Sequence, residues 1–400
     1  MPTNIHVAVT RRNAAVGCAF ALLSGWLLVS CNRDDKPVSI PVFVAGAPAT
    51  NGVFDAALTQ DGSGGLWMSY SVVNVSPNDP QLPRVDTRIA SSSNAGGNWI
   101  DTGVAPYTPP AEFQVTYQNG LRWAAWQYEV SRLVYDQHAT DPNLRWKRFW
   151  HRYLRAKLSG NCADLVAPDC LFQNGWIGVA TAPAPTGPWS PERKLLVGTT
   201  YNVGNNATIG SPEYTPATLA PGGQLAGCPI FTEPGALATA SGVYISLKCA
   251  TGSNTGKVVL LRCGNDLAAA SCVYLGDLLP DTAAPQFTVS GQTYDGFSAT
   301  ELVTVGSTNY LIVTPTIADA YRGCLVFQIA NLNTAALERV GGVPTGMPVL
   351  IKSIFGTPGS FNGACGYSSA ASASGIIYGQ IQVQGSALQF GLYASGVTLP

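Results

Sequence analysis

Three carboxylates stand at matching places in three apolar segments of the chain. Glu129 and Glu233 each lie four residues before a leucine on which the segments align, and Asp55 lies three residues before the corresponding leucine. The chain has 23 Asp and Glu residues in 400, so a third occurrence at one position exceeds random placement. Like charges gathered in a concave site raise some of their pKa values, which general acid catalysis requires. The pattern therefore predicts acid–base chemistry.

Glu233 differs most clearly from its surroundings, because it interrupts the apolar start of the segment CPIFTEPGALATASGVYISLKC, residues 228–249. Pro234 follows it and removes an N–H at the start of a strand, where no ladder partner is required. The apolar neighbours Phe231, Pro234 and Ala236, together with a nearby carboxylate, predict a raised pKa for Glu233. We therefore expect Glu233 to be a general acid that is protonated at the working pH.

Short apolar or alternating runs, separated by turn residues, must position these carboxylates. The 43 Gly and 28 Pro residues fit a chain with many turns, and no long segment has the 3.6-residue period of an amphipathic helix. Hairpins with a common theme recur in five segments: FDAALTQDGSGGLWMSYS, EVSRLVYDQHATDPNLRWKRFWHRY, TEPGALATASGVYISLK, FSATELVTVGSTNYLIVT and GACGYSSAASASGIIYGQ. The chain is therefore predicted to be all-β.

A second hairpin follows each of the first four, marked by residue pairs ten positions apart such as Ile89 and Trp99. This repeat predicts a five-bladed β-propeller over residues 51–400, since a closed ring of four-stranded blades leaves few exposed edges. The early segment PVSIPVFVAG is expected to complete the last blade. A large β-sandwich is the alternative. The inner strands are expected to start near Asp55, Glu129, Glu233, Ser298 and Gly363.

The composition excludes several classes of partner. Charged residues make up 11% of the chain and the net charge is −1, with no basic stripe for nucleic acid and no acidic tail. We expect a monomer that binds a ligand close to neutral. No CxxC pair occurs, and after the N-terminal segment the histidines are His138 and His151, so neither zinc nor another cofactor is expected. Nothing in the sequence supports a structural cation in the channel.

The N-terminus predicts export. Two arginines precede an apolar run that is shorter than the ~20 residues needed to span a bilayer. Leu28-Val29-Ser30-Cys31 resembles a bacterial lipobox, which implies that residues 1–31 are a signal peptide and that Cys31 carries the lipid. Residues 32–50 are then a tether and first strand, and Asn32 implies anchoring to the outer membrane. The alternative is an ordinary signal peptide, in which Cys31 is not lipidated.

Eight cysteines remain once Cys18 and Cys31 are set aside. An even number in an exported chain predicts disulfides, whose connectivity does not follow from the count. Proximity in the sequence favours three pairs and leaves a fourth: Cys162–Cys170, Cys228–Cys249, Cys263–Cys272 and Cys324–Cys365.

Five blades with acidic residues on their inner strands resemble the arabinanase and β-xylosidase type of glycoside hydrolase. The segment IGVATAPAPTGPWS, residues 177–190, is similar to a hairpin common in those enzymes. Glu233-Pro234 is similar to their acid glutamate without its following glycine, and Asp55 takes the place of their base without its proline. Their third carboxylate, which orients the acid, corresponds to Glu129 or to Asp136. The resemblance implies inverting hydrolysis with Glu233 as acid and Asp55 as base.

A second resemblance is local and structural. Residues Ser92 to Trp99, SSNAGGNW, resemble the Asp-box of sialidases, with Asn94 in place of the aspartate. A short polar side chain at this position bonds its own backbone and stabilises a hairpin turn. The segment therefore supports a propeller and does not imply sialic acid as a ligand.

Further side chains are candidates for substrate binding, each with a structural alternative. His151 and Trp126 fit either the channel wall or the packing between blades. Arg322 fits either an anion or a loop carbonyl. Glu301 and Thr300 are neighbours on one strand, so alternation lets only one of them face the channel. Asp136 belongs to this set if it does not orient the acid.

Two functions from different classes remain. One is a glycoside hydrolase that uses paired carboxylates in the propeller channel. The other is a non-catalytic lipoprotein that binds a glycan or a protein on its propeller face. A propeller supports both, so the fold does not decide between them.

Overall fold

The computed structural model describes residues 39–400 except 81, 105–106, 108–110, 118–119, 157–174, 202–210, 252–254, 269–270, 290–291, 319, 344, 356–360 and 385–386. The predicted signal peptide with Cys31, residues 32–38 of the predicted tether, and the Cys162–Cys170 pair lie outside the described residues.

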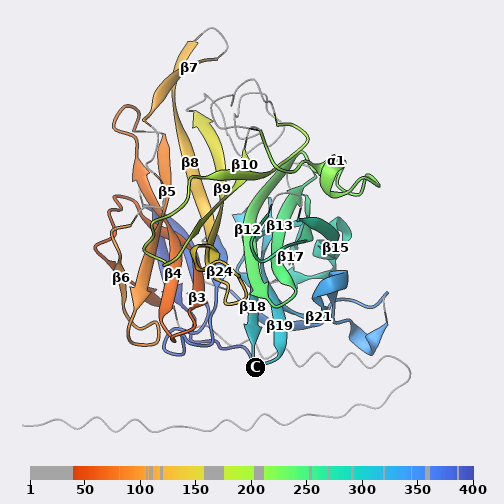
Figure 1. The fold of residues 1–400 in the computed structure, drawn as a ribbon. Helices are drawn as coiled ribbons and strands as arrows, with labels where there is room; N and C mark the ends of the chain where they lie inside the picture. The colour runs from red at the N-terminus through yellow and green to blue at the C-terminus, as the bar shows by residue number, and fades with distance from the viewer. Residues whose placement is uncertain are drawn as a thin grey trace, which may run out of the picture. The chain divides into compact units, whose positions relative to one another are not determined.

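Antiparallel strands make up nearly all of the regular structure (Figure 1). The first run is β3 (Gly52–Gln60), β4 (Leu66–Val75), β5 (Pro83–Ser92) and β6 (Trp99–Asp101). The second is β7 (Phe113–Tyr117), β8 (Gly120–Tyr135), β9 (Trp146–Ala156), β10 (Trp176–Ala182) and β11 (Arg193–Val197). The third is β12 (Ile230–Thr239), β13 (Gly242–Ala250), β14 (Gly256–Cys263) and β15 (Val273–Leu279).

The fourth run is β18 (Gly296–Val305), β19 (Thr308–Ile317), β21 (Cys324–Asn331) and β22 (Ala336–Leu337), with β20 (Ala320–Tyr321) on β19 and β23 (Leu350–Ile354) on β21. The fifth is β24 (Phe361–Gly366), β25 (Ile377–Gln384), β26 (Ala387–Ala394) and β1 (Ile40–Val42). Short elements complete the list: β2 (Val44–Ala45), the β16–β17 pair (Thr288–Val289, Gln292–Thr293), α1 (Pro216–Leu219) and the 3-10 helices η1 (Pro142–Leu144), η4 (Asp281–Gln286), η5 (Leu332–Thr334) and η6 (Val340–Gly342).

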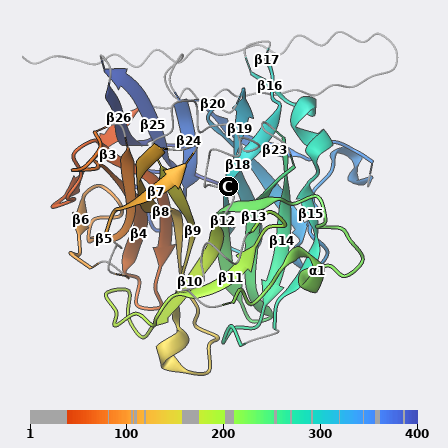
Figure 2. The same cartoon turned by 90° about the horizontal axis from the view of Figure 1, so that it is seen from above.

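Five strands, one from each run, contact one another in a closed cycle and are the inner strands: β3 with β8, β8 with β12, β12 with β18, β18 with β24, and β24 with β3. The sheets therefore stand around a common centre (Figure 2), which is the arrangement of a β-propeller. The predicted all-β class and propeller are confirmed, and the β-sandwich alternative is wrong. The number of blades stays a prediction, because the pairing joins the first and fifth runs into one sheet through Gly52 and Phe390.

Two N-terminal strands join the ends of the ring. β1 pairs antiparallel with β26, the last strand of the chain, as the segment PVSIPVFVAG led us to expect. β2 then pairs parallel with β6 of the first run. The first two strands of the described part of the chain thus cover β26 and β6, so neither is left as an open edge at this point.

The described disulfides confirm three of the four predicted pairs. Cys228–Cys249 joins the start of the β12–β13 hairpin to its end, and Cys263–Cys272 closes the β14–β15 turn. Cys324–Cys365 connects β21 of the fourth run to β24 of the fifth. The Asp-box-like turn also has the expected local role, because Asn94 Oδ1 accepts from the Asn98 N–H at 2.8 Å.

A β-bulge recurs in each of the five inner strands. One residue in each bulge is in the left-handed region: Asp55, Val130, Glu233, Ala299 and Ala364, with φ of 55°, 47°, 55°, 35° and 50°. Glu129, Ser298 and Gly363 lie one residue earlier, so the expected register is wrong by one residue in those strands. Leu237 is the leucine that the sequence pattern matches to Leu58. In the structure, the pairing of β12 with β13 and of β3 with β4 places Ala236 at the level of Leu58.

Candidate active site

Asp55 is the fourth residue of β3 and adopts the left-handed conformation of its bulge. Its side chain is 6% exposed, and its Oδ2 accepts a hydrogen bond from Ser71 Oγ at 2.7 Å. The backbone N–H of Val130, in the neighbouring bulge, is a second donor. Burial raises the pKa of Asp55 to about 7 against these hydrogen bonds, and the charge of Glu233 adds to the increase.

Glu233 occupies the equivalent position in β12 and is 8% exposed. Its carboxylate accepts hydrogen bonds from the Ala299 N–H at 2.7 Å and from the hydroxyls of Ser298 and Tyr321. Burial raises the pKa of Glu233, but the charge of Lys248 and the three donors outweigh burial, so the pKa is lowered. The expectation of a protonated Glu233 is therefore wrong, because these donors and the Lys248 charge stabilise its ionised form. Ser298, Ala299 and Tyr321 are far away in the sequence, so the apolar residues next to Glu233 did not indicate them.

Glu129 lies on β8 directly before the bulge residue Val130 and is half-buried, unlike Asp55 and Glu233. Burial, together with the charges of Asp55 and Glu233, raises its pKa to about 8. A hydrogen bond with the Tyr153 hydroxyl acts in the opposite direction. Asp55 and Glu129 are thus the two members of the cluster with raised pKa values, and Glu129 is the more exposed of the two.

The three carboxylates belong to one cluster, since Glu129 interacts electrostatically with Asp55 and Glu233, and Asp55 with Glu233. Next to it lies a cavity of about 20 Å³, lined among others by Asp55, Val130, Pro234 and Glu301. That volume holds about one water molecule. The arrangement brings together one ionised carboxylate, two carboxyl groups that titrate near neutral pH, and space for a water at the axis.

In three runs, the strand that pairs with the inner strand on its way out of the ring (β4, β9 or β13) supplies a partner for the cluster. The sequence analysis missed two of these partners, Ser71 and Lys248. Ser71 and Lys248 pair in register with the residue directly before the bulge, and His151 pairs in this way with Glu129. Each of these three strands thus has a polar residue opposite the residue that precedes the bulge. An alignment of the three strands reveals this pattern. Tyr153 and Tyr321 carry no such signal, because each reaches the cluster from a different element.

His151 is fully buried on β9 opposite Glu129, and its ring stacks on Tyr153 with centroids 4.8 Å apart. Burial lowers its pKa to about 3, although the charge of Glu233 acts in the opposite direction. His151 is therefore neutral at physiological pH. His151 thus lies opposite Glu129 and contributes a neutral imidazole there and no positive charge.

Glu301 lines the axial cavity and forms a buried ion pair with Arg132. Arg132 also donates to the carbonyls of Ala236 at 3.2 Å and Leu302 at 3.1 Å. Glu301 accepts from the backbone N–H groups of Tyr367, at 3.3 Å, and Leu58. The pair thus touches all five runs of strands, so we assign Glu301 to the structure of the ring.

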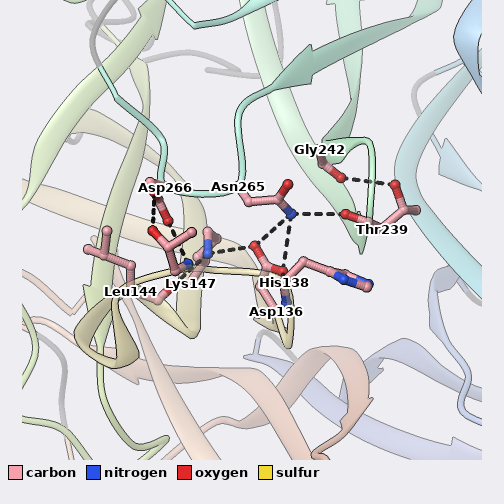
Figure 3. A network of polar contacts seen from close by, with 9 residues as sticks. Asp136, His138, Leu144, Lys147, Thr239, Gly242, Asn265 and Asp266 are labelled. Carbon is pink, nitrogen blue, oxygen red and sulfur yellow. Dashed lines mark hydrogen bonds and ion pairs between the residues drawn. The ribbon is translucent and has the colours of Figure 1, made fainter.

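Asp136 lies outside the carboxylate cluster, in the polar network of Figure 3. It is fully buried and pairs with Lys147 Nζ at 2.9 Å. Asn265 Nδ2 donates to both of its oxygens, at 3.2 and 3.1 Å, and to the Thr239 carbonyl at 2.9 Å. Asp136 therefore joins the second and third runs, and of the two candidates for the third carboxylate only Glu129 is in the cluster.

Asn265→Ala is expected to lower the free energy of unfolding by about 1.5–3 kcal/mol, the range for hydrogen bonds to charged groups. The buried Asp136 carboxylate would lose the two hydrogen bonds from Asn265 Nδ2, while its Lys147 partner would remain. Urea unfolding measures the change. Asn143→Ala is the matched control, since Asn143 is exposed and bonds only locally to Asp141. Equal stability of both variants would show that the network does not hold the two runs together.

Trp126 and Arg322 lie in different surroundings. The Trp126 ring lies 5.1 Å from that of Trp176, and the Arg152 guanidinium lies 4.8 Å from its centroid. Trp126 therefore takes part in aromatic packing within the second run. Arg322 is half-buried and bridges to Asn362 of β24 through its backbone. Within the described ranges, Arg322 Nε has no acceptor.

The described part of the chain contains no group of three or more His, Cys, Asp or Glu side chains that could hold a metal ion. Among the described residues, no helix combines the length and the apolar character needed to span a membrane.

No protein-family model and no curated protein matches the chain, whereas solved structures do. An exo-β-1,3-galactanase from Phanerochaete chrysosporium, solved with galactose, is 14% identical with a TM-score of 0.47, over 89% of this chain and 64% of the galactanase. An endo-arabinase from Bacteroides thetaiotaomicron is 10% identical with a TM-score of 0.43, over 91% of this chain and 97% of its own. An α-L-arabinofuranosidase from Lactobacillus brevis is 9% identical with a TM-score of 0.45, over 87% and 94%.

The chain thus spans less than two thirds of the galactanase. The structures found include the arabinanase type whose resemblance the sequence indicated. At these identities and TM-scores, the chemistry of the site follows from its own residues and not from the matches.

Proposed function

We propose that this chain is an exported, lipid-anchored glycoside hydrolase that cleaves a glycosidic bond with Asp55, Glu129 and Glu233. The observation that carries the proposal is the cluster itself, in which neighbouring carboxyl groups differ in protonation. Pairs of carboxyl groups with separated pKa values are what acid–base hydrolysis of a glycoside needs. The substrate is therefore a carbohydrate.

Exposure and hydrogen bonding assign the roles within the cluster. Asp55 and Glu129 both have raised pKa values, and Glu129, the more exposed of the two, is the general acid. Asp55, whose ionised form accepts hydrogen bonds from Ser71 and Val130, is the general base. Glu233 stays ionised, and its charge raises the pKa of both partners. Compared with the roles that the family resemblance implies, Asp55 keeps its role and the two glutamates exchange theirs.

Hydrolysis then proceeds in one displacement. Glu129 gives its proton to the glycosidic oxygen as the bond from that oxygen to the anomeric carbon breaks. A water attacks the anomeric carbon from the opposite side and gives its proton to Asp55. Inversion of the anomeric centre follows, and it requires the two carboxyl groups to lie ~6.5–9.5 Å apart. Proton exchange with solvent restores the starting state.

The pH dependence of kcat/KM tests these roles. Activity requires ionised Asp55 and protonated Glu129, so it should rise as the pH increases through about 7 and fall as the pH increases through about 8. Because the groups interact, the two limbs report the cluster as a whole. A bell-shaped profile centred at about pH 4, as expected for a base and an acid at the ordinary pKa values of carboxyl groups, would contradict the assignment.

A second function, non-catalytic binding of a glycan or protein, is favoured by one observation. Asp55 accepts a hydrogen bond from the N–H of Val130, the left-handed residue in the inner strand of the following run. Glu233 accepts one from Ala299 in the same way. Thr314 does the same for Ala364, at 2.8 Å, without any carboxylate. In that case the two acidic side chains stabilise strained bulges and do no chemistry. Binding of glycan fragments without turnover, measured by calorimetry and product analysis, would identify this function.

Lipid anchoring is tested separately with Cys31→Ala. The variant is expected to lose labelling by a fatty-acid precursor and to appear in the soluble fraction, since lipid attachment needs the Cys31 thiol. Fractionation of cells that express the chain measures the shift, with Cys18→Ala as the matched control. Membrane retention of Cys31→Ala equal to that of the unmodified chain would overturn the anchor.

A further inference from the structure

A buried polar layer separates the first run of strands from the second. Ser69 Oγ donates to the Ser131 carbonyl at 2.7 Å, from β4 to β8. On β5, the Thr87 N–H donates to the Tyr107 hydroxyl at 2.9 Å. Between these contacts lies Arg148 of β9, which is fully buried. Polar groups in such a layer require partners, because each unpaired donor loses the hydrogen bond that water would provide.

Arg148 has fewer partners than its five N–H groups need. Its Nη2 donates to the Arg88 carbonyl at 3.0 Å and to Ser131 Oγ at 3.3 Å. Its Nε and Nη1 are buried and have no acceptor among the residues that the structure describes. At least two nitrogens of a fully buried guanidinium are thus without a hydrogen-bond partner.

The positive charge of Arg148 is also uncompensated. Its neighbour Arg88 takes the adjacent carboxylate, Asp101, in an ion pair of 2.8 Å. Over the described ranges, no carboxylate lies within 4.0 Å of Arg148 and no aromatic ring takes it as a cation–π partner. Burial lowers the pKa of Arg148 to about 10, so the side chain remains cationic at neutral pH. An isolated buried charge is strongly unfavourable unless a counter-ion accompanies it.

Another buried donor without an acceptor among the described residues belongs to a side chain that packs near β9. Arg148 shares its face of β9 with Trp146 and Trp150, and Trp189 packs against the clusters that contain both. The buried indole nitrogen of Trp189 has no acceptor within the described residues.

We propose that a small inorganic anion, of the size and charge of chloride, binds between the first and second runs on Arg148. A monovalent anion accepts several N–H donors at once and neutralises the guanidinium. A water molecule accepts the same donors and leaves the charge unpaired. The site lies outside the carboxylate cluster, so its role is to hold the two runs together and not to take part in hydrolysis.

Thermal unfolding of the full chain in chloride, at constant ionic strength against gluconate, tests the site. Wild type is expected to unfold at a temperature that rises with chloride concentration, as for any ligand that binds the folded state alone. Arg148→Met should remove this dependence, whereas Arg145→Met, at an exposed position, should keep it. A chloride-independent wild type, or a dependence that persists in Arg148→Met, would overturn the proposal.

A second measurement covers the case in which Arg148→Met does not fold. Crystals of wild type grown in bromide should show an anomalous peak within hydrogen-bond distance of Arg148 Nε or Nη1. A water at that place without anomalous signal would overturn the anion and leave Arg148 solvated by water alone.

Discussion

Glu129→Gln is expected to lower kcat for an unactivated glycosidic bond by about 10²–10⁴-fold, the contribution of a positioned general acid. The amide keeps the shape of the side chain and its contact with Tyr153 but has no proton to give. Glycan affinity should change little, because Glu129 acts on the leaving oxygen. The alkaline limb of the pH profile should disappear as well, since it reports the loss of the Glu129 proton.

The leaving group separates this role from a structural one. Dinitrophenolate leaves the anomeric carbon without protonation, so Glu129→Gln should hydrolyse a dinitrophenyl glycoside at nearly the wild-type rate. Glu233→Gln is the matched comparison, and it should lose activity on both substrates. If Glu233→Gln instead spares the dinitrophenyl glycoside and Glu129→Gln does not, then Glu233 is the acid and the assignment made here is wrong.

Arg132→Met is expected to lower the free energy of unfolding by about 3–5 kcal/mol, because it leaves Glu301 buried and without its counter-ion. The lost guanidinium also releases the carbonyls of Ala236 and Leu302. Urea unfolding measures the loss. Arg84→Met is the matched control, since the Arg84 side chain is 23% exposed and forms longer ion pairs of 3.6 and 3.9 Å.

The double variant Arg132→Met, Glu301→Gln tests the mechanism of that loss. Removal of the second charge should recover part of the stability, because the isolated carboxylate is what costs most. The contradicting result is additivity, in which the double variant loses as much free energy of unfolding as the Arg132→Met and Glu301→Gln variants lose together. The two side chains would then act independently. Their contacts would then stabilise the ring separately and not as an ion pair.

Local patterns were sufficient for most of the fold. Alternation, turn residues and the recurring hairpin theme predicted an all-β chain. Proximity predicted two of the described disulfides, and Cys324–Cys365 was the pair that remained. The pairing of β1 with β26 followed from one unpaired apolar segment near the N-terminus. These features depend on periodicity and on short distances along the chain, which a single sequence contains.

The register of the bulges did not follow from the sequence. A bulge inserts one residue relative to the partner strand, so its position depends on a ladder between two strands. Alignment on leucines therefore grouped Glu129 with Glu233, although Val130 occupies the equivalent position. Glu129 was nevertheless placed in the right cluster, because a difference of one residue leaves it at the same level of the channel.

The electrostatics of the site depended on residues far away in the sequence. Glu233 appeared to have an apolar setting, but Ser298, Ala299 and Tyr321 of the next run donate to its carboxylate. Asp136 likewise finds Asn265 in the following run. Contacts between neighbouring sheets decide which carboxylates are reactive and which are structural, and no local pattern records them.

The most direct test of the central claim is release of reducing ends from a glycan that the folded chain binds, compared between wild type and Asp55→Asn. Asparagine retains an oxygen that can accept the Val130 N–H and the Ser71 hydroxyl, but it is a far weaker base than a carboxylate. Wild type should release reducing ends with inversion at the anomeric carbon, and Asp55→Asn should bind the glycan and release almost none. Wild type that binds the glycan without cleaving it, or Asp55→Asn that cleaves it at the wild-type rate, would contradict hydrolysis by this cluster.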